Sequence, residues 1–133
     1  MKIPNKLKIL LSEDHQTVRE GLKLIFDSQD DMETIGETGN GREITELALE
    51  LQPDVVLMDI SMPELNGLIA TARLKRIAPG IKILTLTRHT DDSYLRELLQ
   101  AGVSGYVLKQ SPSSELLPAV RTVAEGGNYI DPK

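Results

Sequence analysis

The chain has 133 residues, which is the length of a single domain with a full hydrophobic core. It contains no cysteine, which excludes disulfides, thiol nucleophiles and cysteine-bound metals and fits a reducing cytoplasm. The formal net charge of −5 argues against nucleic-acid binding by these residues alone, and no apolar run has the length of a signal peptide or a membrane span.

Five apolar runs of strand length alternate with five segments of helical periodicity along the chain. The runs are rich in Leu, Ile and Val and are bounded by Gly, Pro, Asn and Asp, which favour turns. The predicted strands cover 7–11, 32–38, 55–58, 81–87 and 105–109. The predicted helices cover about 14–27, 42–52, 66–77, 94–101 and 111–126.

Apolar positions at helical spacing predict which side of each helix faces the core. The first helix carries such a stripe, and the third has a weaker one: Val18, Leu22, Ile25 and Phe26 in the first, and Leu68, Ala72 and Leu74 in the third. Pro118 lies within the last predicted helix, where we expect it to remove one hydrogen bond and to bend the first turns.

Regular alternation of strands and helices predicts right-handed βαβ units and a parallel sheet with helices on both faces. The first, third and fourth runs are the most apolar and should be central, whereas the second and fifth should be edges. This favours a flavodoxin-like, doubly wound (βα)5 fold with strand order 2-1-3-4-5. We expect one domain over 1–133, in which 128–133 is a loose tail or the start of a linker.

Polar side chains stand at the carboxyl ends of four of the five predicted strands. Glu13 and Asp14 follow the first strand and Asp59 ends the third, while Thr87 and Lys109 end the fourth and fifth. Each has an ordinary interpretation as a helix cap, a strand residue or a solvated strand end. Their joint placement is much less expected by chance. Because ligands bind at the carboxyl ends of strands in such sheets, we expect one shared pocket.

Three clustered carboxylates repel one another, and a proton or a cation must relieve the repulsion. Oxygen ligands without cysteine or a converging histidine favour a hard cation, Mg²⁺ or the similar Mn²⁺. A carboxylate, a hard cation, an ammonium and a hydroxyl together suit phosphoryl transfer. In that chemistry Asp59 would attack phosphorus while the cation and Lys109 neutralise the phosphoryl oxygens.

The motifs around these residues resemble the receiver domain of two-component response regulators over essentially the whole chain. The matching segments are Leu-Leu-Ser-Glu-Asp-His, Val-Val-Leu-Met-Asp-Ile-Ser-Met-Pro-Glu-Leu-Asn-Gly, Ile-Leu-Thr-Leu-Thr and Ala-Gly-Val-Ser-Gly-Tyr-Val-Leu-Lys. Gln110 stands where the common pattern has proline after the lysine. This departure and the ending Glu-Gly-Gly-Asn-Tyr-Ile resemble the subfamily with a LuxR-type helix-turn-helix output domain.

The resemblance implies that Asp59 accepts phosphate from a phosphohistidine of a sensor histidine kinase. Thr87 and Lys109 would then bind phosphoryl oxygens, and Tyr106 would turn inward as Thr87 moves toward the phosphate. The face formed by the fourth helix, fifth strand and fifth helix would change as a result. The implied ligands of Mg²⁺ or Mn²⁺ are Glu13, Asp14, Asp59 and the backbone carbonyl of Ser61.

The resemblance also implies a switch that gains and loses its own phosphate, rather than an enzyme with turnover. A homodimer could form on phosphorylation, and DNA would be bound only through a C-terminal domain outside this chain; no membrane partner is expected. A single-domain receiver and a non-phosphorylated interaction module remain alternatives. Phosphatases of the haloacid dehalogenase type carry a second Asp two residues after the nucleophile, where Ser61 stands here. A flavin-binding domain would need a glycine- or hydroxyl-rich phosphate loop after the first strand.

Overall fold

The computed structural model describes residues 6–39, 43–59, 67–87, 92–108 and 113–130. The strands are β1 (Leu7–Ser12), β2 (Met32–Thr38), β3 (Val55–Asp59), β4 (Lys82–Thr87), β5 (Gly105–Leu108) and β6 (Tyr129–Ile130). The helices are α1 (Gln16–Asp27), α2 (Ile44–Leu51), α3 (Gly67–Ile77), α4 (Asp92–Ala101) and α5 (Ser113–Ala124). All paired strands are parallel, in the order β2-β1-β3-β4-β5-β6, which confirms the predicted order of the first five.

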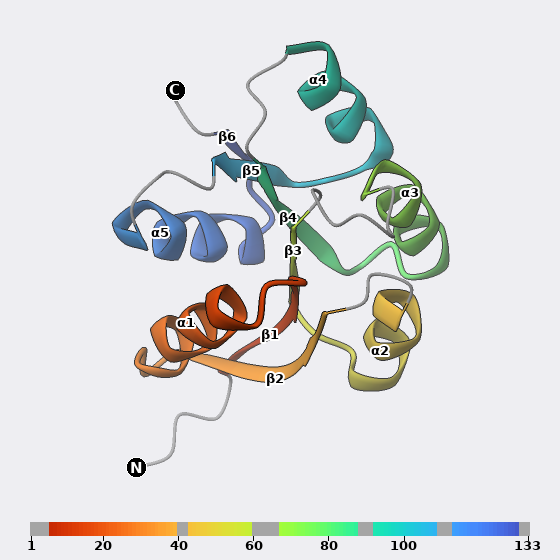
Figure 1. The fold of residues 1–133 in the computed structure, drawn as a ribbon. Helices are drawn as coiled ribbons and strands as arrows, with labels where there is room; N and C mark the ends of the chain where they lie inside the picture. The colour runs from red at the N-terminus through yellow and green to blue at the C-terminus, as the bar shows by residue number, and fades with distance from the viewer. Residues whose placement is uncertain (1–5, 40–42, 60–66, 88–91, 109–112, 131–133) are drawn as a thin grey trace.

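Helices α1 and α5 cover one face of the sheet, and α2, α3 and α4 cover the other (Figure 1). Each face has its own apolar core, and β3 contributes to both because successive side chains of a strand point to opposite faces. Val55 and Leu57 enter the first core, whereas Val56 and Met58 enter the second. This explains why the run is apolar without interruption.

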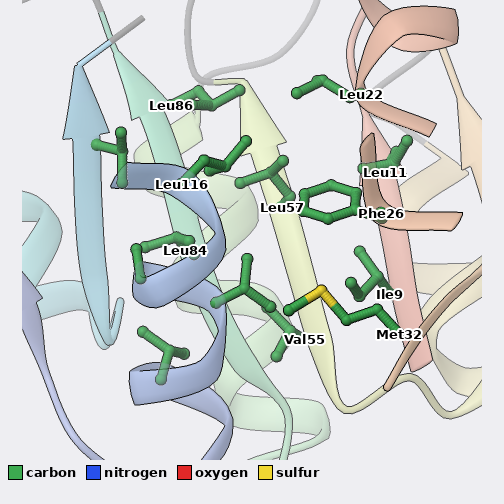
Figure 2. Close-up of a cluster of buried hydrophobic side chains, with 14 residues drawn as sticks. Ile9, Leu11, Leu22, Phe26, Met32, Val55, Leu57, Leu84, Leu86 and Leu116 are labelled. Carbon is green, nitrogen blue, oxygen red and sulfur yellow. The ribbon is translucent and has the colours of Figure 1, made fainter. Parts of the chain in front are cut away.

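Phe26 is the only phenylalanine in the chain and lies in the first core. Figure 2 shows its ring beside Leu57 and Leu11, between α1 and the sheet. Its side chain has no exposed surface, and the rest of this core is mainly aliphatic. Phe26 is therefore the fully buried aromatic side chain of the first core.

The predicted apolar stripes are correct only in part. On α1, Leu22 and Phe26 are buried as predicted, but Val18 is 43% exposed. Since α1 starts just after β1 ends and runs back along the sheet, its first turns lie level with the strand ends and have little sheet to cover. On α3, Ala72 is exposed, and the buried face instead includes Thr71 and Leu74.

The fifth strand is not an edge of the sheet, and two residues of the expected loose tail belong to a further strand. Tyr129 and Ile130 form β6, which pairs in parallel with β5 through Gly105 and Tyr106. A Cβ atom at position 105 would collide with the backbone of Tyr129, so the glycine permits the close approach. The side chain of Tyr129 also packs against the first core. Helix α5 continues through Pro118, which is exposed; the bend expected there stays a prediction.

An ion pair joins the last turn of α5 to the loop between α1 and β2. Arg121 Nε lies 2.9 Å from Asp31 Oδ2, and Arg121 Nη2 donates to Asp31 Oδ1 at 2.9 Å and to Gln29 Oε1 at 3.1 Å. Hydrogen bonding from Arg121 is the main cause that lowers the pKa of Asp31 below its ordinary value. This bidentate pair links segments that are 90 residues apart.

Phe26→Ala should lower the free energy of unfolding by about 3 to 5 kcal/mol, because it removes a buried ring and leaves a cavity. Leu24→Ala on the same helix is the control, since Leu24 is 73% exposed and should change the free energy by less than about 0.5 kcal/mol. Urea unfolding of the three proteins measures both values. Equal effects of the two substitutions would contradict the assignment of Phe26 to the core.

The stabilising effect of the Asp31–Arg121 pair should disappear in acid. Because the pKa of Asp31 is lower in the folded than in the unfolded chain, its contribution is complete above the ordinary aspartate pKa and is lost as the pH falls through the folded value. The side chains are 45% and 40% exposed, so solvent screening limits the contribution to about 0.5 to 1 kcal/mol. The unfolding free energies of Asp31→Asn and of the unmodified chain should differ at neutral pH and converge as the pH falls below the folded pKa of Asp31. A difference in unfolding free energy that stays constant with pH would contradict a stabilising role of the ionised Asp31.

Candidate functional site

The strand register places three of the predicted site residues at one edge of the sheet. Ser12 pairs with Met58, so Glu13 follows at the level of Asp59, the last residue of β3. Asp59 itself pairs with Leu86, so Thr87 lies one residue beyond it on β4. The exposed fractions of Glu13, Asp59 and Thr87 are 1%, 0% and 0%. The prediction that these strand ends meet is confirmed for β1, β3 and β4.

Glu13, Asp14, His15 and Asp59 form one cluster of potential metal ligands. Each has one ligand atom within 4.8 Å of those of the other three. Asp14 is partly exposed, with 26% of its side chain accessible, whereas Glu13 and Asp59 lie below the surface. The cluster therefore opens to solvent from the side of Asp14 and ends inside the domain at Asp59.

His15 was not among the residues predicted for the site, and the expectation of no converging histidine is wrong. Its Nδ1 atom lies 3.2 Å from Glu13 Oε2 and 3.2 Å from Asp14 Oδ1, and its backbone N–H donates to Glu13 Oε2 at 3.1 Å. His15 is also the N-cap residue of α1. The turn after β1, which places the imidazole beside both carboxylates, has no clear signature in the sequence beyond adjacency to the acidic pair.

These residues fit a divalent cation. Asp14 Oδ1 is buried and accepts no hydrogen bond from the described parts of the chain, although His15 Nδ1 is near. Three carboxylates within 4.8 Å of one another favour a positive charge between them. Carboxylate oxygens suit Mg²⁺, and the nearby imidazole is also compatible with Mn²⁺.

The other predicted site residues lie on β5, before its carboxyl end, or outside the described residues. Tyr106 pairs with Thr85 and is buried in the second core at 9% exposure. Leu108 pairs with Thr87, and Lys109 follows it in the sequence. Lys109 and Ser61 both lie outside the described residues, so their roles stay predictions.

The sheet order and the acidic cluster at the ends of β1 and β3 define the class of protein. The profile of the response regulator receiver domain family matches residues 9–121, and the chain belongs to this family. The oxygen regulatory protein NreC of Staphylococcus carnosus is 44% identical over 128 residues, which are 96% of this chain and 59% of that protein. The transcriptional regulatory protein DegU of Brevibacillus brevis is 43% identical over 129 residues, which are 97% of this chain and 55% of that protein.

Two solved structures show the same fold. A two-component response regulator of the LuxR family from Aurantimonas sp. SI85-9A1 superposes with a TM-score of 0.91 at 30% identity, over 96% of this chain and 91% of that one. The signal receiver domain of NarL from Mycobacterium tuberculosis has a TM-score of 0.87 at 28% identity, over 92% and 99%. The chain spans somewhat over half the length of the curated relatives NreC and DegU. Among the described residues, no helix is long and apolar enough to cross a membrane.

Asp59→Asn should stabilise the metal-free chain, because it removes one of several like charges held within 4.8 Å. The expected gain in the free energy of unfolding is about 1 to 3 kcal/mol, the Coulomb repulsion of two such charges at effective dielectric constants between water and a protein surface. Urea unfolding in excess chelator measures it, with Glu33→Gln at an exposed position of β2 as the control. A loss of stability in Asp59→Asn would contradict the account.

Proposed function

We propose that Asp59 accepts a phosphoryl group from a phosphohistidine of a sensor histidine kinase, and that this modification controls an output domain. The observation that carries the proposal is the carboxylate of Asp59 at the inner end of the acidic cluster, in a chain of the receiver family. Transfer forms a bond between a carboxylate oxygen of Asp59 and phosphorus, while the phosphorus–nitrogen bond breaks and the imidazole takes up a proton.

Glu13, Asp14 and Asp59 would hold Mg²⁺, or Mn²⁺, together with the backbone carbonyl of Ser61. The bound cation would supply positive charge between the carboxylates and the incoming phosphoryl oxygens. The distances within the cluster and the buried Asp14 Oδ1 support the three carboxylates of this ligand set. Asp59 has no exposed surface and Asp14 is partly exposed, so the phosphoryl donor would approach from the side of Asp14.

Thr87 and Lys109 would bind phosphoryl oxygens, through a hydroxyl and an ammonium respectively. The register that places Thr87 one residue beyond the partner of Asp59 supports the first contact. Phosphorylation would favour the state in which Thr87 moves toward the phosphate and Tyr106 is held inward, where it already lies in this structure. The face of α4, β5 and α5 would change with this equilibrium.

The chain would act as a switch and not as a turnover enzyme, because the phosphoryl group stays on Asp59 until water removes it. Ser61 stands where a haloacid dehalogenase-type phosphatase has its general acid, which supports slow release. The similarity to NreC, DegU and a LuxR-family regulator suggests a cytoplasmic transcription regulator. DNA would be bound by a LuxR-type helix-turn-helix domain beyond these residues, with a homodimer formed on phosphorylation.

The mass of the intact chain after incubation with acetyl phosphate and Mg²⁺ tests the proposal. The unmodified sequence should gain one phosphoryl group, and Asp59→Asn should gain none, because an amide cannot form the acyl phosphate. Asp54→Asn is the matched control, since Asp54 lies exposed at the opposite end of the same strand and should leave labelling unchanged.

Labelling of Asp59→Asn at another residue would refute the assignment of the acceptor. Failure of the unmodified chain to take up phosphate at all, with the fold intact, would favour the alternative of a non-phosphorylated interaction module. Rapid, continuous release of inorganic phosphate, with little labelled chain accumulating, would favour a phosphatase.

A further inference from the structure

Arg19, on the first turns of α1, binds the loop that carries the acidic pair. Its Nη1 atom donates to the backbone carbonyl of Glu13 at 2.7 Å, and its Nε atom donates to Glu37 Oε1 at 2.9 Å. Only 18% of the Arg19 side chain is exposed. One guanidinium therefore connects the acidic loop to β2 through two hydrogen bonds in a partly buried setting.

The neighbours of Arg19 also help to fix the position of its guanidinium group. Glu37 also forms an ion pair with Lys23, whose Nζ lies 3.3 Å from Glu37 Oε2. Hydrogen bonding from Arg19 is the main cause that lowers the pKa of Glu37, so this carboxylate stays ionised at neutral pH. Gly39 leaves room for the guanidinium, because a Cβ atom there would lie 2.8 Å from Arg19 Nη1.

The backbone of Glu13 is thus fixed on both sides. Its N–H donates to the carbonyl of Thr38, the last residue of β2, at 3.0 Å, and its own carbonyl accepts from Arg19. That carbonyl belongs to the peptide group shared with Asp14, so the bond to Arg19 orients both acidic residues. Without it, repulsion among the clustered carboxylates would tend to move this loop away from Asp59.

We infer that Arg19 is a positioning residue of the cation pocket: by binding the Glu13 carbonyl and Glu37, it holds Glu13 and Asp14 against Asp59 so that a divalent cation can bind. The inference rests on the proposed function of this pocket. Arg19 does not touch the cation, and it acts through the loop, in the way that outer hydrogen bonds orient metal ligands.

Titration with Mg²⁺, followed by backbone amide chemical shifts in NMR spectra, tests the inference. Arg19→Met keeps a chain of similar length but removes both hydrogen bonds, and it should raise the Kd for Mg²⁺ about tenfold or more. Arg19→Lys retains one ammonium donor, so its Kd for Mg²⁺ should lie between those of the unmodified chain and of Arg19→Met. Gly39→Ala should also raise the Kd for Mg²⁺, but by a smaller factor than Arg19→Met, because the added methyl group displaces the guanidinium.

Arg121→Met is the matched control, since Arg121 also binds a carboxylate through Nε at 2.9 Å but lies away from the pocket, on the last turn of α5. It should lower the stability of the fold without changing the Kd for Mg²⁺. In labelling with acetyl phosphate, saturating Mg²⁺ should restore the rate of Arg19→Met, whereas a general folding defect would persist.

An unchanged Kd in a folded Arg19→Met, or an equal rise in Arg121→Met, would overturn the inference and leave the proposed function intact. Should the unmodified chain fail to bind Mg²⁺ in the same titration, both the proposed function and the inference would fall. A Kd that rises in Arg19→Met and Gly39→Ala but not in Arg121→Met is the result that we expect.

Discussion

Parallel pairing of β1, β3 and β4 in one fixed register is the constraint on which the rest of the structure depends. A parallel sheet places the carboxyl ends of neighbouring strands at one edge, about 5 Å apart between adjacent strands. The pairs Ser12–Met58 and Asp59–Leu86 then decide that Glu13, Asp59 and Thr87 lie together. A shift of one residue in either pair would turn a site side chain into the core.

The same register creates an energetic problem, because it gathers carboxylates where water is scarce. Glu13 and Asp59 have almost no exposed surface, and Asp14 and His15 complete the cluster within 4.8 Å. The fold can hold such charges together only if other contacts fix the loop and a proton or a cation offsets the repulsion. The hydrogen bonds from Arg19 and to Thr38 fix the loop, and a balance that a ligand can change suits a switch.

Much of this could be predicted from the sequence, because strong hydrophobic patterns determine central strands. The uninterrupted apolar run from Val55 to Met58 predicted β3 as a central strand. The polar residues at the ends of the apolar runs predicted Glu13, Asp59 and Thr87 as site residues. The addition of β6 could not be predicted, since a two-residue strand depends on a tertiary contact at Gly105. The approach of His15 depends on the turn after β1, which no periodicity records. The roles of Lys109 and Ser61 remain predictions.

The central claim is that residues far apart in the sequence form one cation pocket around Asp59. Paramagnetic broadening of amide signals by substoichiometric Mn²⁺ tests it most directly, because the effect falls steeply with distance from the ion. The broadening should centre on Glu13, Asp14, Asp59 and Thr87, and the amide signals of Asp31 and Arg121 should remain sharp. Broadening centred on another acidic surface, or no selective broadening of these four residues, would contradict it.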